Sequence, residues 1–185
     1  MLETHAAHST ALAAYTALQG QWTLRRKLTS FLQGFPSGSF TGTATFTPRP
    51  PTDATFSAES LYAEDGDFVM ENGLAFKANR RYVYRYHEQK NEITAWFVKD
   101  DGNTVDYYFH HLGFEQGQGV VVSNGPAGTA TECVMAKGDH LCVKDMYYST
   151  YDFRFREDGG LKTFGIKYEV KGPSKDYISD AWYTR

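Results

Sequence analysis

Cysteine, proline and long apolar runs are all scarce in this sequence. The two cysteines, Cys133 and Cys142, are too few for a disulfide-stapled scaffold, and without a Cys-x-x-Cys pair a redox dithiol or zinc knuckle has no support. No apolar run approaches the roughly 18 residues that a membrane span requires. The first fifteen residues lack the basic segment of a secretion signal, so we expect a cytoplasmic protein with reduced thiols.

An excess of charge of either sign is also missing. The 185 residues include 19 basic and 22 acidic side chains, with a net charge of −3, and this balance argues against a basic surface for nucleic acid. Aromatic residues are abundant instead: 13 Phe, 13 Tyr and 3 Trp make up 16% of the chain. A chain of this size and composition is typical of one globular domain, which we assign to residues 1–185.

Only the N-terminal segment, residues 1–20, predicts a helix. Ser9 or Thr10 can cap its start, and Gly20 can end it. Apolar residues recur there at three-residue spacing and predict a modest apolar stripe: Leu12, Tyr15 and Leu18.

The remainder, residues 21–185, predicts about ten strands. Residues 39–47 alternate strictly, with Phe40 and Phe46 on one face and threonines on the other. Turn signals recur about every 8–15 residues; they include Asp65-Gly66, Asn72-Gly73 and the stretch 136–140 between the two cysteines. This pattern favours an all-β fold, an antiparallel barrel of about 8–10 strands with one N-terminal α-helix. A β-sandwich is the alternative.

The two ends of the predicted barrel carry a recognisable pair of residues. Gly20-x-Trp22 opens the first strand directly after the helix, and Arg185 follows the last strand. A guanidinium over an indole face is favourable and would join the first strand to the last. The pairing resembles the calycin, or lipocalin-like, pattern, and we predict a structural role for both residues. Arg25 is the other candidate partner for the indole ring.

A further set of motifs extends this resemblance along the chain. They are Trp22, Arg25, Gly42-x-Ala44-x-Phe46, Phe109-His110, His140-x-Cys142-x-x-Asp145-x-Tyr147, Val170-x-Gly172-Pro173-x-Lys175-Asp176 and Arg185. With them the segment from Leu18 to Arg185 resembles the lipocalin-like family called domain of unknown function 6314. His111 departs from the pattern, in which an acidic residue follows the histidine. The resemblance implies the barrel fold and carries no activity.

Two histidines are the main candidates for proton transfer. His110 and His111 are adjacent on a strand and therefore point to opposite faces, and the resemblance favours His110 as the inward one. His110 is either a hydrogen-bonded histidine among tyrosines or a general acid/base. His140, Asp145 and Tyr147 form either a satisfied polar network or an acid/base dyad in which Asp145 orients His140.

Nucleophilic and metal chemistry have weaker support. Cys142 lies two residues from His140 on one strand, so their side chains project in parallel, which is poor geometry for a thiolate–imidazole pair. A metal site would need His110, His140 and Asp145 to converge, and the sequence gives no sign that they do. We predict neither a metal nor another cofactor.

The tyrosine-rich strands can form a core, a pocket lining or a stacking platform. In the stretch from Arg81 to Tyr86 the tyrosines share one face and Arg81 and Arg85 the other, which suggests an exposed arginine row over a buried tyrosine row. The predicted ligand-binding residues are Tyr82, Tyr84, Phe97, Tyr107, Tyr151 and Lys175, and the predicted catalytic residues are His110, His140, Asp145 and Tyr147.

Two functions stay open for such a barrel. Both begin with the binding of a hydrophobic or amphipathic small molecule in the cavity. The protein is either a cofactor-independent isomerase or cyclase, or a carrier or sensor without turnover. We expect a small-molecule partner, no nucleic acid, no membrane span, and a monomer or homodimer.

Overall fold

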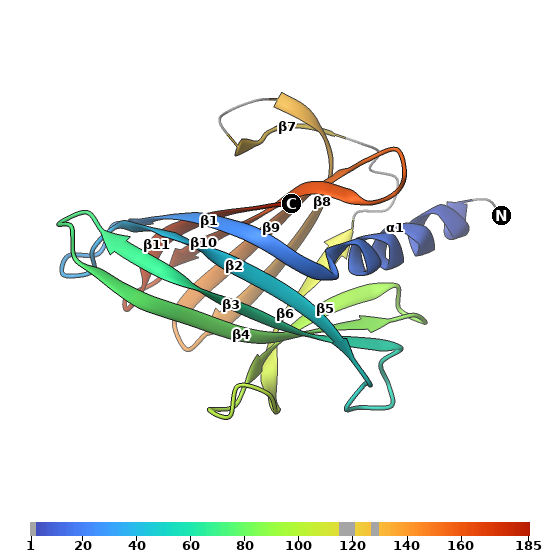
Figure 1. The fold of residues 1–185 in the computed structure, drawn as a ribbon. Helices are drawn as coiled ribbons and strands as arrows, with labels where there is room; N and C mark the ends of the chain where they lie inside the picture. The colour runs from blue at the N-terminus through green and yellow to red at the C-terminus, as the bar shows by residue number, and fades with distance from the viewer. Residues whose placement is uncertain (1–2, 115–120, 127–129) are drawn as a thin grey trace.

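A computed structural model describes residues 3–114, 121–126 and 130–185 (Figure 1). The described part contains one helix and eleven strands: α1 (Glu3–Leu18), β1 (Gly20–Ser30), β2 (Gly38–Arg49), β3 (Ala58–Met70), β4 (Ala75–His87), β5 (Glu92–Val98), β6 (Val105–Phe114), β7 (Val121–Asn124), β8 (Ala130–Cys142), β9 (Asp145–Phe155), β10 (Leu161–Lys171) and β11 (Asp176–Thr184). Within these residues no helix is long and apolar enough to cross a membrane.

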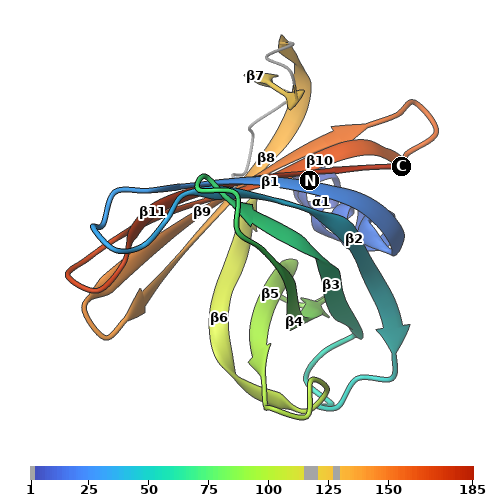
Figure 2. The same ribbon diagram turned by 60° about the vertical axis from the view of Figure 1, so that its left-hand side comes forward.

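Ten of the strands form a closed antiparallel barrel. The strand order is β6-β5-β4-β3-β2-β1-β11-β10-β9-β8, and β6 also pairs with β8, which closes the ring. The short strand β7 pairs with β8 outside the ring. Figure 2 shows the strands curving round a common interior. The predicted all-β barrel with one N-terminal helix is confirmed.

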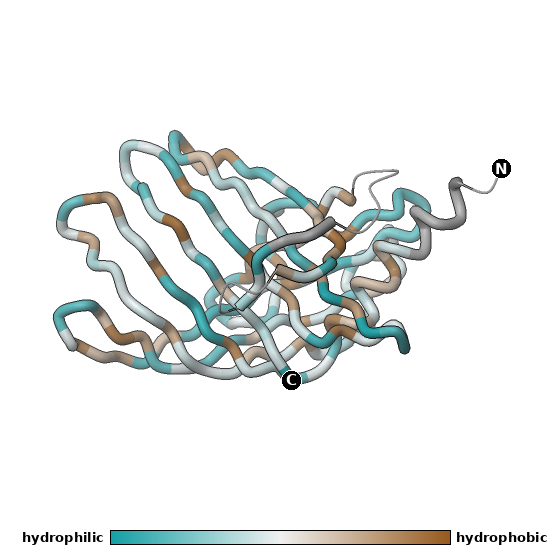
Figure 3. The backbone as a smooth tube through the Cα atoms, turned by 90° about the horizontal axis from the view of Figure 1, so that it is seen from above, coloured by the Kyte–Doolittle hydropathy of each residue, from teal (hydrophilic) through white to brown (hydrophobic). Residues whose placement is uncertain are grey.

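Side chains of alternating polarity define the interior of the barrel. In β2 the predicted face with Phe40 and Phe46 is buried, while the threonines between them are exposed or half-buried. Figure 3 shows short hydrophobic segments interspersed with hydrophilic ones along the strands. The largest fully buried rings gather near the end of the barrel beside α1: Trp22, Phe46, Tyr151, Phe153, Phe164 and Tyr183.

Helix α1 packs against this end of the barrel. Tyr15 stacks on Tyr86 of β4 with 5.8 Å between ring centroids, and its hydroxyl lies 2.7 Å from the Ser60 hydroxyl of β3. The helix begins at Glu3, so the predicted start at Ser9 or Thr10 is wrong. Tyr15 and Leu18 of the predicted stripe are buried, whereas Leu12 is 46% exposed because Ala11 and Ala14 complete the buried face.

Two predicted turns lie inside strands. β3 continues through Asp65-Gly66, and β8 continues through residues 136–140. Glycine is required at both places because the neighbouring backbone is too close for a side chain: a Cβ at Gly66 would lie 2.3 Å from the Thr41 carbonyl oxygen, and one at Gly138 would lie 2.0 Å from that of His111. Such mid-strand glycines resemble turn signals in the sequence.

The continuity of β8 also separates the cysteines. Cys133 and Cys142 lie nine residues apart along one extended strand, so they do not face each other across a turn. In the part of the chain that the structure describes, neither cysteine forms a disulfide.

The exposure of one arginine differs from the prediction. Arg85 is 5% exposed, and its guanidinium lies over the rings of Phe56 and Trp96 and donates to Glu59. Residues that precede β3 therefore cover this part of the outer face, whereas the tyrosine row on the inner face, Tyr82, Tyr84 and Tyr86, is as predicted.

The first and last strands meet at Trp22 and Arg185. β1 pairs with β11, and the Arg185 guanidinium carbon lies 3.9 Å from the centroid of the Trp22 ring. Arg185 also donates to the carbonyl oxygens of Ala17 at 3.0 Å and Gln19 at 2.8 Å, which are left unpaired at the end of α1. The predicted pair is confirmed, and Arg25 is exposed on the outer face of β1. One side chain thus ties the helix, the first strand and the last strand together.

We expect Arg185→Met to lower the free energy of unfolding by about 2 kcal/mol, because it removes a cation–π contact and two hydrogen bonds to helix carbonyls. Urea denaturation measures the difference. Arg156→Met is the matched control: this arginine is half-exposed and pairs with exposed Asp158, so its loss should change stability by less than about 0.5 kcal/mol. Equal stability of wild type and Arg185→Met would contradict the role assigned to this contact.

Candidate functional site

A cavity of about 570 Å³ opens at the end of the barrel away from α1. The β1–β2, β3–β4 and β10–β11 connections surround it, because each of these hairpins turns at that end (left in Figure 1). Its apolar wall includes Leu28, Leu32, Phe35, Phe68, Met70 and Phe76. Its polar lining includes Ser30, Arg80, Tyr147, Lys175, Asp176 and Tyr177.

The mouth of the cavity has an exposed apolar rim. Phe31 and Phe35 of the β1–β2 loop are 60% and 62% exposed, and Leu74 and Phe76 at the β3–β4 turn are 63% and 51% exposed. Phe35 and Phe76 also line the cavity, so the apolar surface continues from the outside inward. An apolar molecule therefore meets favourable surface before it enters.

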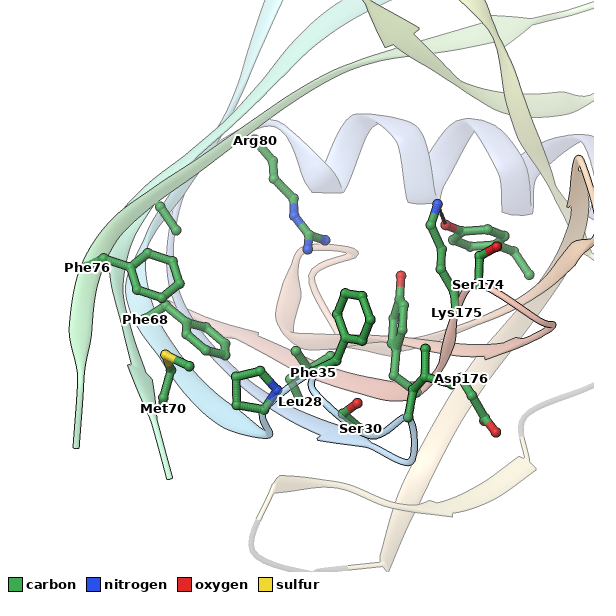
Figure 4. A pocket seen from close by; sticks show the side chains of 15 residues that line it. Leu28, Ser30, Phe35, Phe68, Met70, Phe76, Arg80, Ser174, Lys175 and Asp176 are labelled. Carbon is green, nitrogen blue, oxygen red and sulfur yellow. Dashed lines mark hydrogen bonds between the residues drawn. The ribbon is translucent and has the colours of Figure 1, made fainter. Parts of the chain in front are cut away.

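Hydrogen-bond donors dominate the polar side of the cavity. Lys175 donates from Nζ to the Tyr147 hydroxyl at 2.7 Å, and the same ammonium lies 5.3 Å from the Tyr147 ring centroid. Burial raises the pKa of Tyr147, and it raises the pKa of Tyr177 to about 12, so both phenols are protonated at neutral pH. Figure 4 shows Arg80 and Lys175 extending into the same side of the cavity.

A buried ion pair lies next to Arg80. Arg26 of β1 donates to both carboxylate oxygens of Glu64 at 2.7 Å, and the Tyr62 hydroxyl donates to the same carboxylate. Burial alone would raise the pKa of Glu64, but the hydrogen bonds and charge of Arg26 hold it below its ordinary value. Arg80 Nε lies 3.8 Å from a Glu64 carboxylate oxygen, which is too far for a hydrogen bond. Glu64 therefore pairs mainly with Arg26.

His110 lies inside the barrel but does not line the cavity. Ala95 of β5 pairs with His110, whereas Trp96 pairs with Tyr108, so Phe109 is an extra residue. This bulge turns both Phe109 and His110 inward. His110 Nε2 lies 3.0 Å from the Tyr168 hydroxyl and 3.4 Å from that of Tyr151. Burial lowers the pKa of His110 to about 4, so the imidazole is neutral at neutral pH.

His140 and Asp145 do not form a pair. The His140 ring lies 5.5 Å from that of Phe109 and 6.1 Å from that of Tyr147, and burial lowers its pKa. Asp145 Oδ1 instead accepts hydrogen bonds from the backbone N–H groups of Ser174 and Lys175, at 3.0 and 3.2 Å. Asp145 therefore holds the β10–β11 turn that carries Lys175.

The predicted ligand-binding residues are divided between the cavity and the core. Lys175 lines the cavity, as does Tyr147 from the predicted catalytic set. Tyr84 and Tyr151 are buried with their hydroxyls 2.9 Å apart. Tyr82 stacks on Phe109, and Phe97 packs on Phe109 and on Tyr107, which is 51% exposed. These five aromatic residues form the packed interior and its edge.

Several residues of the cavity were not predicted from the sequence: Arg80, Tyr177, Phe68 and Phe76. A signal for Arg80 was present, since it has the same parity as Tyr82 and Tyr84 and therefore shares their inward face. In the described segments no three His, Cys, Asp or Glu side chains are close enough together to hold a metal ion.

We expect acid to destabilise the fold partly through His110. The pKa of His110 is about 4 in the folded protein and about 6.5 in the unfolded chain, so above pH 6.5 the imidazole is neutral in both states. As the pH falls from 6.5 toward 4, the unfolded chain binds a proton that the folded protein does not, and the free energy of unfolding decreases. Between pH 7 and pH 4.5 the loss from this group is roughly 2 kcal/mol. Urea denaturation at both pH values should therefore show a smaller loss for His110→Gln than for wild type, whereas His111→Gln should follow wild type. The same loss in all three proteins would refute this role.

Comparisons with known proteins place the chain in a family. A solved structure, that of an S-type phycobiliprotein lyase from Guillardia theta, is similar at 8% identity and a TM-score of 0.41, covering 100% of this chain and 97% of the lyase. A search of curated proteins gave no match. The model of a family of unknown function, DUF6314, matches residues 18–185, as the sequence motifs predicted. The chain therefore belongs to the DUF6314 family.

Proposed function

We propose that the protein binds an amphipathic small molecule in the cavity at the open end of its barrel. The observation that carries this proposal is the cavity itself, with an apolar wall on one side and a cluster of hydrogen-bond donors on the other. Its volume of about 570 Å³ lies within the range of roughly 300–1,000 Å³ that is usual for small-molecule sites.

The packing of the barrel supports binding at this end. Rings of Trp22, Phe46 and Phe164 fill the end beside α1, with 4.8 Å between the centroids of Trp22 and Phe164. A ligand would therefore enter through the rim formed by Phe35 and Phe76. It would remove apolar cavity surface from water, which is favourable by about 25 cal/mol per Å².

A carrier or sensor role follows most directly from the placement of the polar groups. His110 is bonded to tyrosine hydroxyls away from the cavity, and Asp145 is committed to a turn. The groups that reach the cavity are suited to recognition, since Lys175, Arg80 and the phenols of Tyr147 and Tyr177 all donate hydrogen bonds.

Isomerisation or cyclisation of the bound molecule is the second candidate function. The contact between Lys175 and Tyr147 supports it, because a phenol beside an ammonium group can donate a proton to a bound carbonyl or double bond without a cofactor. Shape and exclusion of water would supply the rest of the catalysis.

Filling the cavity should abolish binding. Ala78 lines the cavity, whereas Ala75 on the same strand is exposed and has the opposite parity. We expect Ala78→Phe to weaken the binding of the neutral dye Nile red at least about tenfold, and Ala75→Phe to leave it unchanged, by fluorescence titration. Thermal unfolding establishes that both variants are folded. Equal binding by folded Ala78→Phe and wild type would contradict the proposed site.

An experiment with the natural ligand distinguishes a protein that converts the bound molecule from one that only binds it. The molecule that co-purifies with the protein from its own source is added back to wild type and to Tyr147→Phe, and chromatography follows its fate. A carrier returns the molecule unchanged from both proteins, which is the result we expect. Conversion by wild type that is lost in Tyr147→Phe, with the molecule still bound, would establish the second candidate instead.

A further inference from the structure

The cavity holds more positive than negative charge. Arg80 and Lys175 are its two cationic lining residues, and Asp176 is its one acidic lining residue. The guanidinium of Arg80 comes from β4 and the ammonium of Lys175 from the β10–β11 turn, so the two cations approach from different walls of the barrel. Figure 4 shows both on one side of the cavity, with Phe68 and Met70 on another.

Neither cation has a carboxylate of its own. Glu64 accepts from Arg26 with both oxygens at 2.7 Å, and Arg80 reaches it only at 3.8 Å. Lys175 donates to a neutral phenol, that of Tyr147, and makes no ion pair with the described acidic residues. A cation in a partly enclosed site is costly to desolvate without a partner, so a ligand that brings a negative charge is favoured there.

The net charge of the residues that line the cavity favours a ligand with one negative charge. Arg26 and Glu64 neutralise each other, and by formal count Arg80, Lys175 and Asp176 leave the cavity lining with a net charge of +1. A monoanion balances the remaining positive charge, whereas a cation would be repelled. A carboxylate suits the planar donor fork of Arg80 and can accept from Lys175 and Tyr177 as well.

The apolar wall defines the rest of the molecule. Phe76 lies at the mouth, and Arg80 lies four residues further along β4, away from the β3–β4 turn. A head group at Arg80 would therefore direct an apolar body along Ala78 and Phe68 toward the rim at Phe35. This arrangement favours a single chain or a compact ring system with a charge at one end.

We infer that the cavity selects amphipathic monocarboxylates, with Arg80 and Lys175 as the head-group site and the rings of Phe68 and Phe76 as the wall for the apolar body. This inference rests on the proposed function, because it assigns a chemical class to the ligand of the same cavity. Arg80 and Lys175 then determine specificity, and the apolar wall supplies affinity for any molecule of suitable shape.

The test compares two probes that share a twelve-carbon chain, one with an anionic carboxylate head group and one with a neutral hydroxyl. Dodecanoate below its critical micelle concentration and dodecan-1-ol below its solubility limit displace Nile red from wild type, Arg80→Gln, Lys175→Gln and Lys77→Gln. Lys77 is the matched control: it lies on β4 with the opposite parity to Arg80, and its ion pair with Asp67 is exposed. We expect dodecanoate to bind wild type at least about tenfold more tightly than the alcohol, since charge-assisted hydrogen bonds are the stronger ones.

The variants identify the groups responsible. Arg80→Gln and Lys175→Gln should each remove most of the preference for dodecanoate, because the carboxylate loses a charge-assisted hydrogen bond and the alcohol has none to lose, and Lys77→Gln should keep the preference. Thermal unfolding verifies the fold of each variant, and if Arg80→Gln fails to fold, Lys175→Gln with its surface control decides the matter.

The other outcomes separate the two proposals. Equal affinity of wild type for both probes, with both blocked by Ala78→Phe, would overturn the monocarboxylate inference and leave the proposed binding function intact. A preference for dodecanoate that survives in Arg80→Gln and Lys175→Gln would overturn the assigned head-group site. Failure of wild type to bind either probe or Nile red would overturn both proposals.

Discussion

The circumference of a ten-stranded ring is the constraint on which the rest of this structure depends. Side chains just fill the interior of a barrel of about eight strands, so ten strands leave space that ordinary aliphatic residues cannot occupy. The abundance of aromatic residues meets this demand at one end, where Trp22, Phe164 and Tyr183 pack ring against ring. The other end lies beyond these rings and remains hollow, and this hollow is the candidate site.

Buried polar groups divide the interior into a fixed part and an available part. The hydroxyls of Tyr84 and Tyr151 bond to each other, and Tyr151 and Tyr168 bond to His110, so these groups satisfy one another and hold the core in one arrangement. Arg26 and Glu64 form a second satisfied set. Arg80 and Lys175 are different, because their donors face a space that a ligand can fill. The buried groups that stabilise the fold therefore have hydrogen-bond partners within the protein, whereas Arg80 and Lys175 have donors and charge left for a ligand.

Local alternation in the sequence was enough to predict most of the fold and part of the site. The inward face of β2 and the tyrosine row of β4 follow from strand parity, whereas the contact between Trp22 and Arg185 was expected from the resemblance to the lipocalin-like pattern. Gly66 and Gly138 were misleading, because close approach between strands and a tight turn both require glycine. Which end of the barrel stays open depends on contacts between distant strands, so the apolar wall with Phe68 and Phe76 could not be predicted, whereas Arg80 was missed although its strand parity pointed inward.

The central claim is that an amphipathic molecule occupies the hollow end and not the aromatic core or the outer surface. A two-dimensional NMR titration of isotopically labelled protein with dodecanoate tests it most directly, because each backbone amide reports its own surroundings. The account predicts saturable shifts at residues of the cavity, such as Leu28, Ala78, Lys175 and Tyr177, with the amides around Trp22 unchanged. Shifts confined to the outer face, or none at saturating concentration, would contradict it.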